Sequence, residues 1–426
     1  MIPIYSHSLT ERLRYTLDVL FKRILQVDYK WVDKASFEKA KPPKINYSDT
    51  AIAGAIWIKP HSLLFETGIT EQDIQVTYRK EIPYFFKTDD LATILFDIFA
   101  ASFYMLSRYE EYLPFNPDKH GRFRAEASLA YKTGFLQKPV VHLWAQRLRE
   151  EIVKCDPLFS FPSGSFTQLN TIDIDVAYAC QGKPWYRRAG GFIKKIFHFY
   201  NQATWQTLDC KDGDPYDTYD VLETVQKETQ VPSLYFFQVG KYGTYDKNLP
   251  LRKPMKQLIR RINTYAEIGI HPSYRSNRKR AILQKEVSDL SEVLGKKITK
   301  SRQHYLKMRL PETYENLITA GILEDYTMGF AGQISFRAGM AVPFPFFNLK
   351  LNQERPLLIV PFQLMDGTLK DYLKLSPEEA LKRAEVIKEI VKQVKGQLVT
   401  IFHNSSLNDT ADWKGWLAVY RELYIE

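Results

Sequence analysis

Short apolar runs alternate with amphipathic segments through residues 166–426, and several of the runs end abruptly in polar, chemically reactive residues. The runs have the length of strands, and the segments between them have the period of helices. Strands and helices that alternate at this spacing predict a mainly parallel sheet. Because the loops at the carboxyl ends of parallel strands converge, we expect the polar residues there to share one site.

The first 165 residues follow a different pattern. They predict an edge strand at 2–5, then a helix, and further helices near 90–112 and 140–153. A stretch rich in Pro, Ser and Gly follows and marks a boundary. We therefore expect an N-terminal α/β accessory domain at 1–165 and a second domain at 166–426.

The first strand expected in the second domain carries two carboxylates, in Leu169-Asn-Thr-Ile-Asp173-Ile-Asp175. Alternation along a strand turns Asp173 and Asp175 to the same face, roughly 6 to 7 Å apart. This spacing suits a division of work, in which one carboxylate holds a metal ion and the other takes a proton from activated water. A pair that only caps a turn is the alternative.

Three of the eight histidines also follow strand-like runs. His271 follows the run at 266–270, His304 lies near the end of the run that starts at Ile298, and His403 follows Leu398-Val-Thr-Ile-Phe. A lone buried histidine is more often a core residue than a ligand. The repeated placement favours a functional interpretation for His271 and His403, while for His304 both interpretations stay open.

The order of these motifs resembles the polysaccharide deacetylase (NodB-homology) family of carbohydrate esterases, over residues 166–426. The motifs are Thr171-Ile-Asp173-Ile-Asp175, Leu234-Tyr-Phe-Phe-Gln-Val-Gly240, Gly269-Ile-His271-Pro-Ser273, Arg302 with Pro311, and Phe402-His403. The resemblance implies a distorted (β/α)7 barrel and a divalent metal, with zinc expected and cobalt, nickel or manganese as alternatives. It also implies a hydrolase of non-peptide carbon–nitrogen bonds, in which activated water removes an acetyl group from an amino sugar or an esterified sugar.

The resemblance gives individual residues their roles. Asp173 is the expected catalytic base and Asp175 a metal ligand. His271 is the expected first histidine ligand, Arg302 the residue that orients the base, and His403 the general acid that protonates the leaving group.

One position departs from the family pattern. The family has a second histidine four residues after the first, and this chain has Arg275 there. A guanidinium group stays protonated and does not bind a metal. His304 is the expected replacement ligand, with Ser273 or water as weaker substitutes. A degenerate, metal-free barrel that binds a glycan is therefore the alternative to an enzyme.

Residues 329–347 are rich in Gly, Pro and aromatic residues, and they predict a loop over the mouth of the barrel. Arg337 in this loop either binds an anionic sugar group or pairs with Asp325, and the rings either stack on a sugar or pack the rim. Tyr178 and Ser273 are the other expected substrate contacts. The charged residues 107–111 are expected to be a solvated helix end. The alternative is that they dock against the barrel, together with residues 121–123, or help to close its mouth.

The chain has 426 residues and 45% hydrophobic content, enough for two buried cores. It has no apolar run of about 18 residues and no start typical of a secretion signal, so we expect no transmembrane segment. The three cysteines lack metal-binding spacing, and we expect reduced thiols in a cytoplasmic protein. These cysteines are Cys155, Cys180 and Cys210.

The net charge of +10 is compatible with nucleic acid, anionic membranes or acidic glycans. No nucleic-acid partner is expected, because no recognised binding module accompanies the charge. Residues 183–200 mix basic and apolar side chains and predict either an interfacial helix, with peripheral membrane contact, or an insertion after the first barrel strand. The resemblance implies an acetylated sugar or glycoconjugate as the partner. The motifs of serine hydrolases, zincins and nucleotide enzymes are missing, which argues against those three classes.

Overall fold

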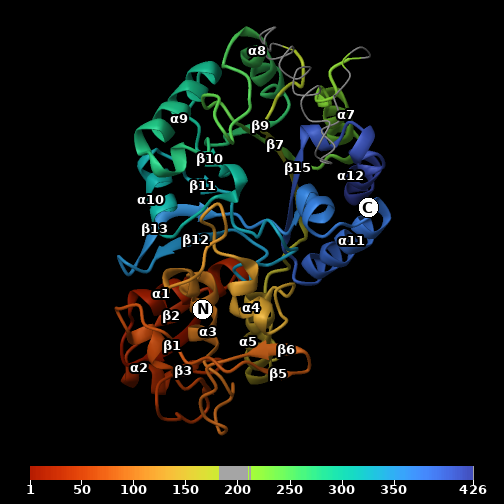
Figure 1. Cartoon of the computed structure of the whole chain (residues 1–426). Coiled ribbons are helices and arrows are strands. Elements are labelled where there is room, and N and C mark those ends of the chain that lie inside the picture. Colours follow the sequence, from red (N-terminus) through yellow and green to blue (C-terminus); the bar gives the residue numbers. More distant parts are fainter. Residues whose placement is uncertain (182–209, 211–212, 426) are drawn as a thin grey trace.

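The computed structural model describes residues 1–181, 210 and 213–425, and it has a mixed α/β architecture with two main sheets (Figure 1). One sheet lies in residues 1–165, which we call the N-terminal segment, and the other in residues 166–426, the C-terminal segment. A continuous hydrophobic core joins the two segments. The expected α/β class is confirmed, while the domain boundary near residue 165 stays a prediction because this core runs across it.

The sheet of the N-terminal segment has four parallel strands in the order β2-β1-β3-β4. β1 has a neighbour on each side, so the prediction of an edge strand at 2–5 is wrong. Its Ile2 and Ile4 side chains are fully buried, which accounts for the interior position. The strands are β1 (Ile2–Ser6), β2 (Tyr29–Trp31), β3 (Ile45–Tyr47) and β4 (Ile56–Trp57).

Two helices of the N-terminal segment begin where a polar side chain caps them. Thr10 accepts a backbone hydrogen bond of 3.1 Å at the start of α1, and Asp97 accepts two of 2.9 Å at the start of α3. The helix predicted near 90–112 is therefore shorter than expected. The elements are α1 (Glu11–Leu17) with a π-helical continuation (Asp18–Leu25), α2 (Lys34–Lys39), α3 (Ile98–Leu106), α4 (Leu129–Lys132), α5 (Val140–Cys155) and a hairpin of β5 (Thr77–Arg79) and β6 (Ile82–Tyr84).

The C-terminal segment contains a nine-stranded sheet in the order β12-β13-β11-β10-β9-β8-β7-β15-β14. All neighbours are parallel except β12 and β13, so the prediction of a mainly parallel sheet is confirmed. The strands are β7 (Thr167–Ile174), β8 (Ser233–Phe237), β9 (Glu267–Ile270), β10 (Lys300–Ser301), β11 (Glu324–Asp325), β12 (Phe344–Asn348), β13 (Gln353–Ile359), β14 (Leu364–Met365) and β15 (Gln397–His403).

The two ends of this sheet are connected by a short piece of chain. β13 lies next to one edge and β14 forms the other edge, and only residues 360–363 separate them in the sequence. Gln363 donates its backbone N–H to Val399 of β15, and Phe362 donates to Met328 beyond β11. Among the described residues no strand pairing joins β13 to β14, so hydrogen-bonded ladders do not close the sheet into a ring.

Helices follow the strands of the C-terminal segment and lie on the outside of the curved sheet (Figure 1). The alternation predicted from the apolar runs is confirmed, and α11 begins with a capping box of Ser376 and Glu379. The helices are α7 (Tyr219–Thr229), α8 (Lys253–Ile262), α9 (Arg280–Leu294), α10 (Glu312–Thr319), α11 (Pro377–Gln393) and α12 (Trp416–Tyr424).

The predicted loop at 329–347 does not lie free over a mouth. Residues 344–347 belong to β12, which pairs with β13. The preceding stretch is bound to the N-terminal segment, because Phe336 donates its N–H to Leu136 and Gly339 accepts from Val141. The aromatic rings therefore pack in the shared core, as the alternative interpretation stated.

Cys180 and Cys210 form a disulfide, and Cys155 is an exposed thiol. The expectation of three reduced thiols is therefore wrong, and thiol chemistry no longer supports the expected cytoplasmic location. In the described part of the chain, no helix combines the length and apolar character needed to cross a membrane. The prediction for residues 183–200 falls outside the described residues.

Candidate active site and metal centre

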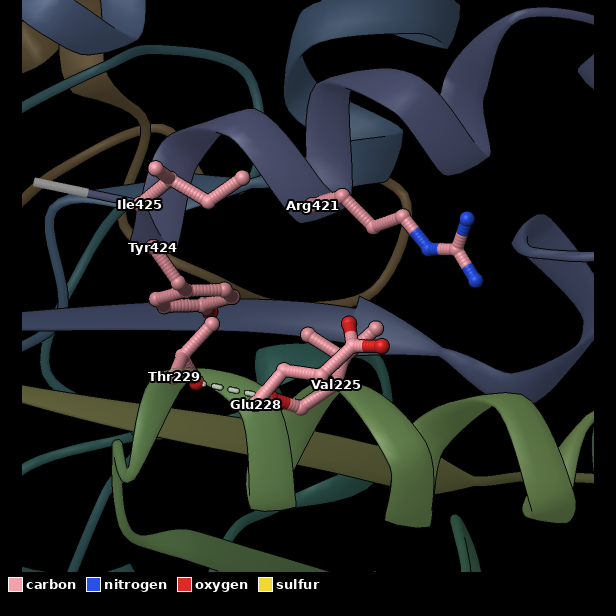
Figure 2. Close-up of a pocket in the computed structure, with 6 residues that line it drawn as sticks. All are labelled: Val225, Glu228, Thr229, Arg421, Tyr424 and Ile425. Carbon is pink, nitrogen blue, oxygen red and sulfur yellow. Dashed lines mark hydrogen bonds between the residues drawn. The ribbon is translucent and has the colours of Figure 1, made fainter.

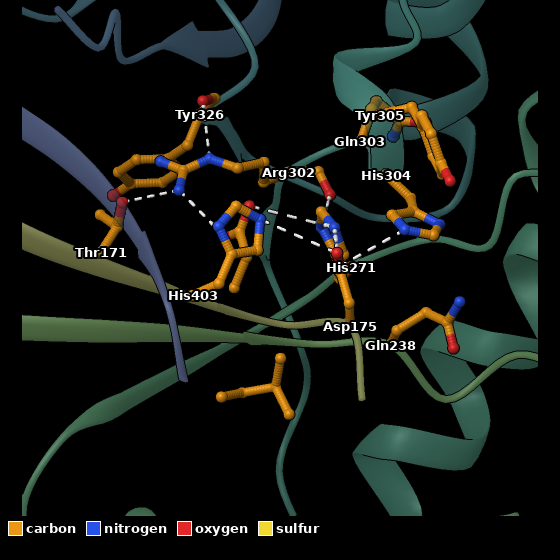
Figure 3. Close-up of polar contacts among 12 residues, drawn as sticks. Thr171, Asp175, Gln238, His271, Arg302, Gln303, His304, Tyr305, Tyr326 and His403 are labelled. Atoms are coloured by element: carbon orange, nitrogen blue, oxygen red, sulfur yellow. Dashed lines mark hydrogen bonds and ion pairs between the residues drawn. The ribbon is translucent and has the colours of Figure 1, made fainter. Parts of the chain in front are cut away.

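The sheet gathers the predicted site residues at the carboxyl ends of adjacent strands. Asp173 and Asp175 lie at and just after the end of β7, His271 follows β9, His304 follows β10, and His403 ends β15. The strand order β10-β9-β8-β7-β15 makes these ends neighbours. Figure 3 shows Asp175 and the three imidazoles turned toward one another.

Asp175, His271 and His304 form a compact group, which we call the cluster. Each has one potential ligand atom within 4.8 Å of the other two. Oδ1 of Asp175 lies 3.0 Å from Nε2 of His271 and 3.5 Å from Nε2 of His304. Both imidazoles are buried, whereas the Asp175 side chain is 35% exposed, so solvent reaches the cluster from that side.

The other ring nitrogen of each histidine has a partner of its own. Nδ1 of His271 lies 2.6 Å from the carbonyl oxygen of Arg302, and Nδ1 of His304 lies 3.0 Å from Oδ1 of Asp246. Because these partners accept hydrogen bonds, each Nδ1 carries a proton, and each Nε2 is left facing Asp175, where it binds a metal once it is free of a proton of its own.

The same geometry leaves Oδ1 of Asp175 without a hydrogen-bond partner among the described residues, although the atom is buried. A buried carboxylate oxygen beside two imidazole Nε2 atoms is a donor set suited to a divalent cation such as zinc. The residues present therefore fit the metal that the family resemblance implies.

The electrostatic surroundings also favour positive charge at this point. Burial lowers the pKa of His304, but Asp175 and then Asp246 outweigh it and raise the pKa to about 9. Burial raises the pKa of Asp175, but the two histidines hold it well below its usual range. A carboxylate that stays ionised is the form that binds a cation.

Asp173 lies beside the cluster and is held by an arginine. Nη1 of Arg302 donates to Oδ1 of Asp173 at 3.0 Å and to the hydroxyl of Thr171 at 2.6 Å, and its Nε donates to the carbonyl of Tyr326 at 3.0 Å. Arg302 is fully buried and Asp173 is 3% exposed. Oδ2 of Asp173 lies 3.9 Å from Nε2 of His271, so this oxygen faces the cluster.

His403 reaches the cluster from β15, the neighbour of β7 on the side away from β8. Its Nδ1 lies 2.9 Å from Oδ1 of Asp366, and its Nε2 lies 3.8 Å from Oδ2 of Asp175. Burial lowers its pKa, but Asp366 and then the aspartates of β7 outweigh it and raise the pKa to about 10. His403 is therefore an acid at neutral pH with its Nε2–H directed at the cluster.

Two carboxylates that orient these histidines were not among the predicted site residues. Asp366 directly follows β14, so the rule applied to the other strand ends would have found it. Asp246 lies nine residues after the end of β8, and no local pattern marks it. It also accepts hydrogen bonds from Gln238 and from the backbone of Tyr274, which tie two further loops to His304.

Tyr178 and Ser273, the predicted substrate contacts, point elsewhere. The Tyr178 ring packs edge-on against the Tyr219 ring, with 5.8 Å between the ring centres. Burial raises the pKa of the Tyr178 hydroxyl to about 12. Ser273 is buried against Gly240, and a Cβ added to Gly240 would lie only 2.5 Å from the Cβ of Ser273. The described contacts place neither residue in the cluster, and Arg275 is exposed.

The prediction that Arg337 binds the substrate is wrong. Its Nε and Nη2 donate to both carboxylate oxygens of Glu111 at 2.9 and 2.6 Å, and its Nη1 donates to the carbonyl of Gly329 at 2.8 Å. With its donors occupied and 3% exposure, Arg337 has no face left for a sugar. The alternative pairing with Asp325 is also wrong, since that carboxylate accepts from Ser301 and Thr327. Residues 107–111 are docked and not solvated.

A cavity of about 280 Å³ lies between α7 and α12, away from these residues (Figure 2). It shares no residue with the cluster, and its charged groups come from two side chains at the surface. Its lining residues are Val225, Glu228, Thr229, Arg421, Tyr424 and Ile425. The candidate active site is therefore the group of residues at the strand ends, and this cavity is separate from it.

Comparisons with known proteins give a family for the N-terminal segment and distant structural neighbours for the rest. Residues 2–157 match a family of unknown function (DUF7033), and no curated protein matches the chain. A candidate polysaccharide deacetylase from Mycobacterium smegmatis is 18% identical, with a TM-score of 0.41, over 62% of this chain and 85% of that chain. A probable polysaccharide deacetylase from Pseudomonas aeruginosa PAO1 is 11% identical, with a TM-score of 0.38, over 61% of this chain and 83% of that chain.

A third solved structure is a pseudoenzyme. BA3943 from Bacillus anthracis, described as a CE4 family pseudoenzyme, is 11% identical, with a TM-score of 0.31, over 61% of this chain and 60% of that chain. These likenesses are too distant to indicate an activity. The functional conclusion therefore depends on the geometry of the cluster.

Proposed function

We propose that this chain is a metal-dependent hydrolase that removes acetyl groups from a carbohydrate or glycoconjugate, on a distorted (β/α)7 barrel of the polysaccharide deacetylase type. The carrying observation is the buried Oδ1 of Asp175, which faces the Nε2 atoms of two imidazoles and has no hydrogen-bond partner among the described residues. The short link between β13 and β14 supports the barrel, because it holds the two ends of the sheet together.

Asp175, His271 and His304 would hold the metal. His304 takes the role of the family's second histidine, whose position Arg275 occupies in this chain. When bound, a divalent cation such as zinc supplies Lewis acidity and makes water nucleophilic near neutral pH. Zinc as the metal and an acetylated sugar as the substrate both belong to the proposal.

Two side chains move protons in the proposed reaction. Asp173 takes a proton from the attacking water at Oδ2, while Arg302 holds its other oxygen and keeps the carboxylate oriented. His403 gives the proton on Nε2 to the departing nitrogen or oxygen, and Asp366 holds the ring in place for this step. No nucleophilic serine is needed.

The test combines metal analysis with acetate release from N-acetylated and O-acetylated oligosaccharides. The protein is purified without chelator, together with Asp175→Ala, Asp173→Asn and the exposed control Asp90→Asn. We expect bound metal that only Asp175→Ala loses. Asp173→Asn should keep the metal and lose about 10²- to 10⁴-fold in rate, since proton transfer contributes that much.

A wild-type protein that neither binds metal nor releases acetate would overturn the proposal. If such a protein still binds the oligosaccharides, the metal-free glycan-binding alternative takes its place. Acetate release that is unchanged in Asp173→Asn would exclude that residue as the base.

A further inference from the structure

Four rings form a patch beside the cluster, which we call the aromatic platform. The Tyr305 ring lies 4.6 Å from that of His304, and 5.5 Å from that of Tyr245. Tyr245 in turn lies 4.2 Å from Tyr274, and the His120 ring lies 4.8 Å from Tyr305. The platform thus begins beside His304 of the cluster, next to which Figure 3 shows Tyr305.

The platform is built from both segments of the chain. Tyr245, Tyr274 and Tyr305 lie on the loops after β8, β9 and β10, but His120 belongs to the N-terminal segment. Residues 113–124 carry it, and Figure 1 shows this part of the chain, in orange, extending to the strands of the C-terminal segment. His120 is 5% exposed, and its Nδ1 lies 3.3 Å from the hydroxyl of Tyr274.

A second residue of the same loop fixes the backbone of the platform. Nη1 of Arg122 donates to the carbonyl of Tyr305 at 2.7 Å, while its Nε pairs with Asp118 at 2.7 Å. Tyr305 has a left-handed backbone with φ of 61°, which is uncommon for a residue with a side chain. The arginine contact therefore holds the ring in a conformation that the local sequence does not favour.

Two rings of the platform remain open to solvent. Tyr245 is 39% exposed and Tyr305 is 38% exposed, although buried groups hold both of them. The site is also open to solvent, since the Asp175 and His403 side chains are 35% and 24% exposed. Exposed, immobilised tyrosines beside a polar centre combine an apolar face with a hydroxyl, which suits a ligand that has both kinds of surface.

We propose that the aromatic platform binds a sugar ring of the substrate, and that the N-terminal segment thereby contributes part of the substrate site. The C–H face of a pyranose packs on Tyr245 and Tyr305, and the acetyl group of the same or a neighbouring sugar faces the cluster. His120 and Arg122 position the two tyrosines. The proposal rests on the proposed function, and it assigns a role to the DUF7033 part of the chain.

The test measures oligosaccharide binding by the full-length, zinc-loaded protein with calorimetry. The probes are the tetramer of N-acetylglucosamine and an O-acetylated xylo-oligosaccharide. Tyr245→Ala should weaken binding of the preferred probe about tenfold, in line with the value of one aromatic contact. Tyr245→Phe keeps the ring and should bind as wild type, and so should Tyr131→Ala, which removes an equally exposed tyrosine elsewhere.

Arg122→Ala tests the contribution of the N-terminal segment. It should raise KM for the oligosaccharide more than it lowers kcat, and more than it changes hydrolysis of 4-nitrophenyl acetate, because that ester has no sugar ring. Circular dichroism verifies folding of each variant.

The outcomes separate this proposal from the proposed function. Metal binding and acetate release with undiminished oligosaccharide affinity in Tyr245→Ala would overturn the platform alone. Oligosaccharide binding that depends on Tyr245, without metal or acetate release, would support the platform and overturn the hydrolase. If neither probe binds the wild-type protein, the platform is overturned as well.

Discussion

The three histidines of the site have the same chemistry in isolation, and their partners give them different roles. His271 and His304 donate through Nδ1 to a carbonyl and to Asp246, which leaves each Nε2 directed toward Asp175. His403 donates to Asp366 and lies near the aspartates of β7, which raise its pKa to about 10. It therefore carries a proton on both nitrogens at neutral pH. The second partner of each ring decides whether it suits a metal or a leaving group.

Asp246 supplies a test of this view. Asp246→Asn should lower metal affinity by about 10- to 100-fold, because the carboxylate fixes the tautomer and orientation of a ligand histidine. His304→Ala should lower it further, and Arg275→Ala should leave it unchanged, since Arg275 is exposed. Competition with a fluorescent chelator measures the affinities. Equal losses in Arg275→Ala and His304→Ala would contradict the assignment of His304 as a ligand.

At the scale of elements, short strands determine where the site residues point. β10 pairs over only Lys300 and Ser301, so the chain leaves the sheet before His304. The turn that follows contains Tyr305 in a left-handed conformation and brings the His304 ring to Asp246. Without this turn, alternation along a longer strand would have kept Arg302 and His304 on one face of the sheet.

The capping box of α11 permits a prediction at this scale. Ser376 accepts from the backbone of Glu379 at 3.3 Å, and the Glu379 side chain accepts from the backbone of Ser376 at 2.9 Å. Ser376→Ala should lower the free energy of unfolding by about 1 kcal/mol, because one N-terminal amide loses its acceptor. Ser376→Asp can still cap and serves as the control. Urea denaturation compares them, and equal losses in both variants would count against the cap.

At the scale of the whole molecule, a buried ion network ties the two segments together. Arg108 and Arg337 share the carboxylate of Glu111, and Arg108 also donates to the carbonyl of Arg337. Burial raises the pKa of Glu111, but the two arginines outweigh it and lower the pKa below its usual value. The network lies in the same continuous core that joins both sheets.

Glu111→Gln should lower the free energy of unfolding by about 3 kcal/mol, because it leaves Arg337 in the interior without a counter-charge and Arg108 with Glu110 alone. Since the folded pKa lies below the unfolded value of about 4.3, the wild-type contribution is complete above that value and is lost as pH falls through the folded pKa. Denaturation at pH 7 and at about pH 3.5 measures this, with the exposed Glu150→Gln as control. A variant as stable as wild type at pH 7 would contradict the role of the network.

Much of the site was predictable from the chain because its signals are local. The two-residue spacing of Asp173 and Asp175 fixes their common direction on one strand, and the apolar runs before His271 and His403 mark strand ends. Parallel topology then implies that such ends meet, whichever strands are neighbours. The alternation of runs and helical segments likewise predicted the mainly parallel sheet.

Tertiary structure alone decided the partners. Glu111 holds Arg337 across 226 positions of sequence, and the loop with His120 and Arg122 reaches the strand ends from the other segment. Such contacts depend on strand order and on how two segments dock, and no periodicity within either segment encodes them. A loop rich in Gly and aromatic residues therefore looked like a cover for the site, whereas the fold buried it as part of the core.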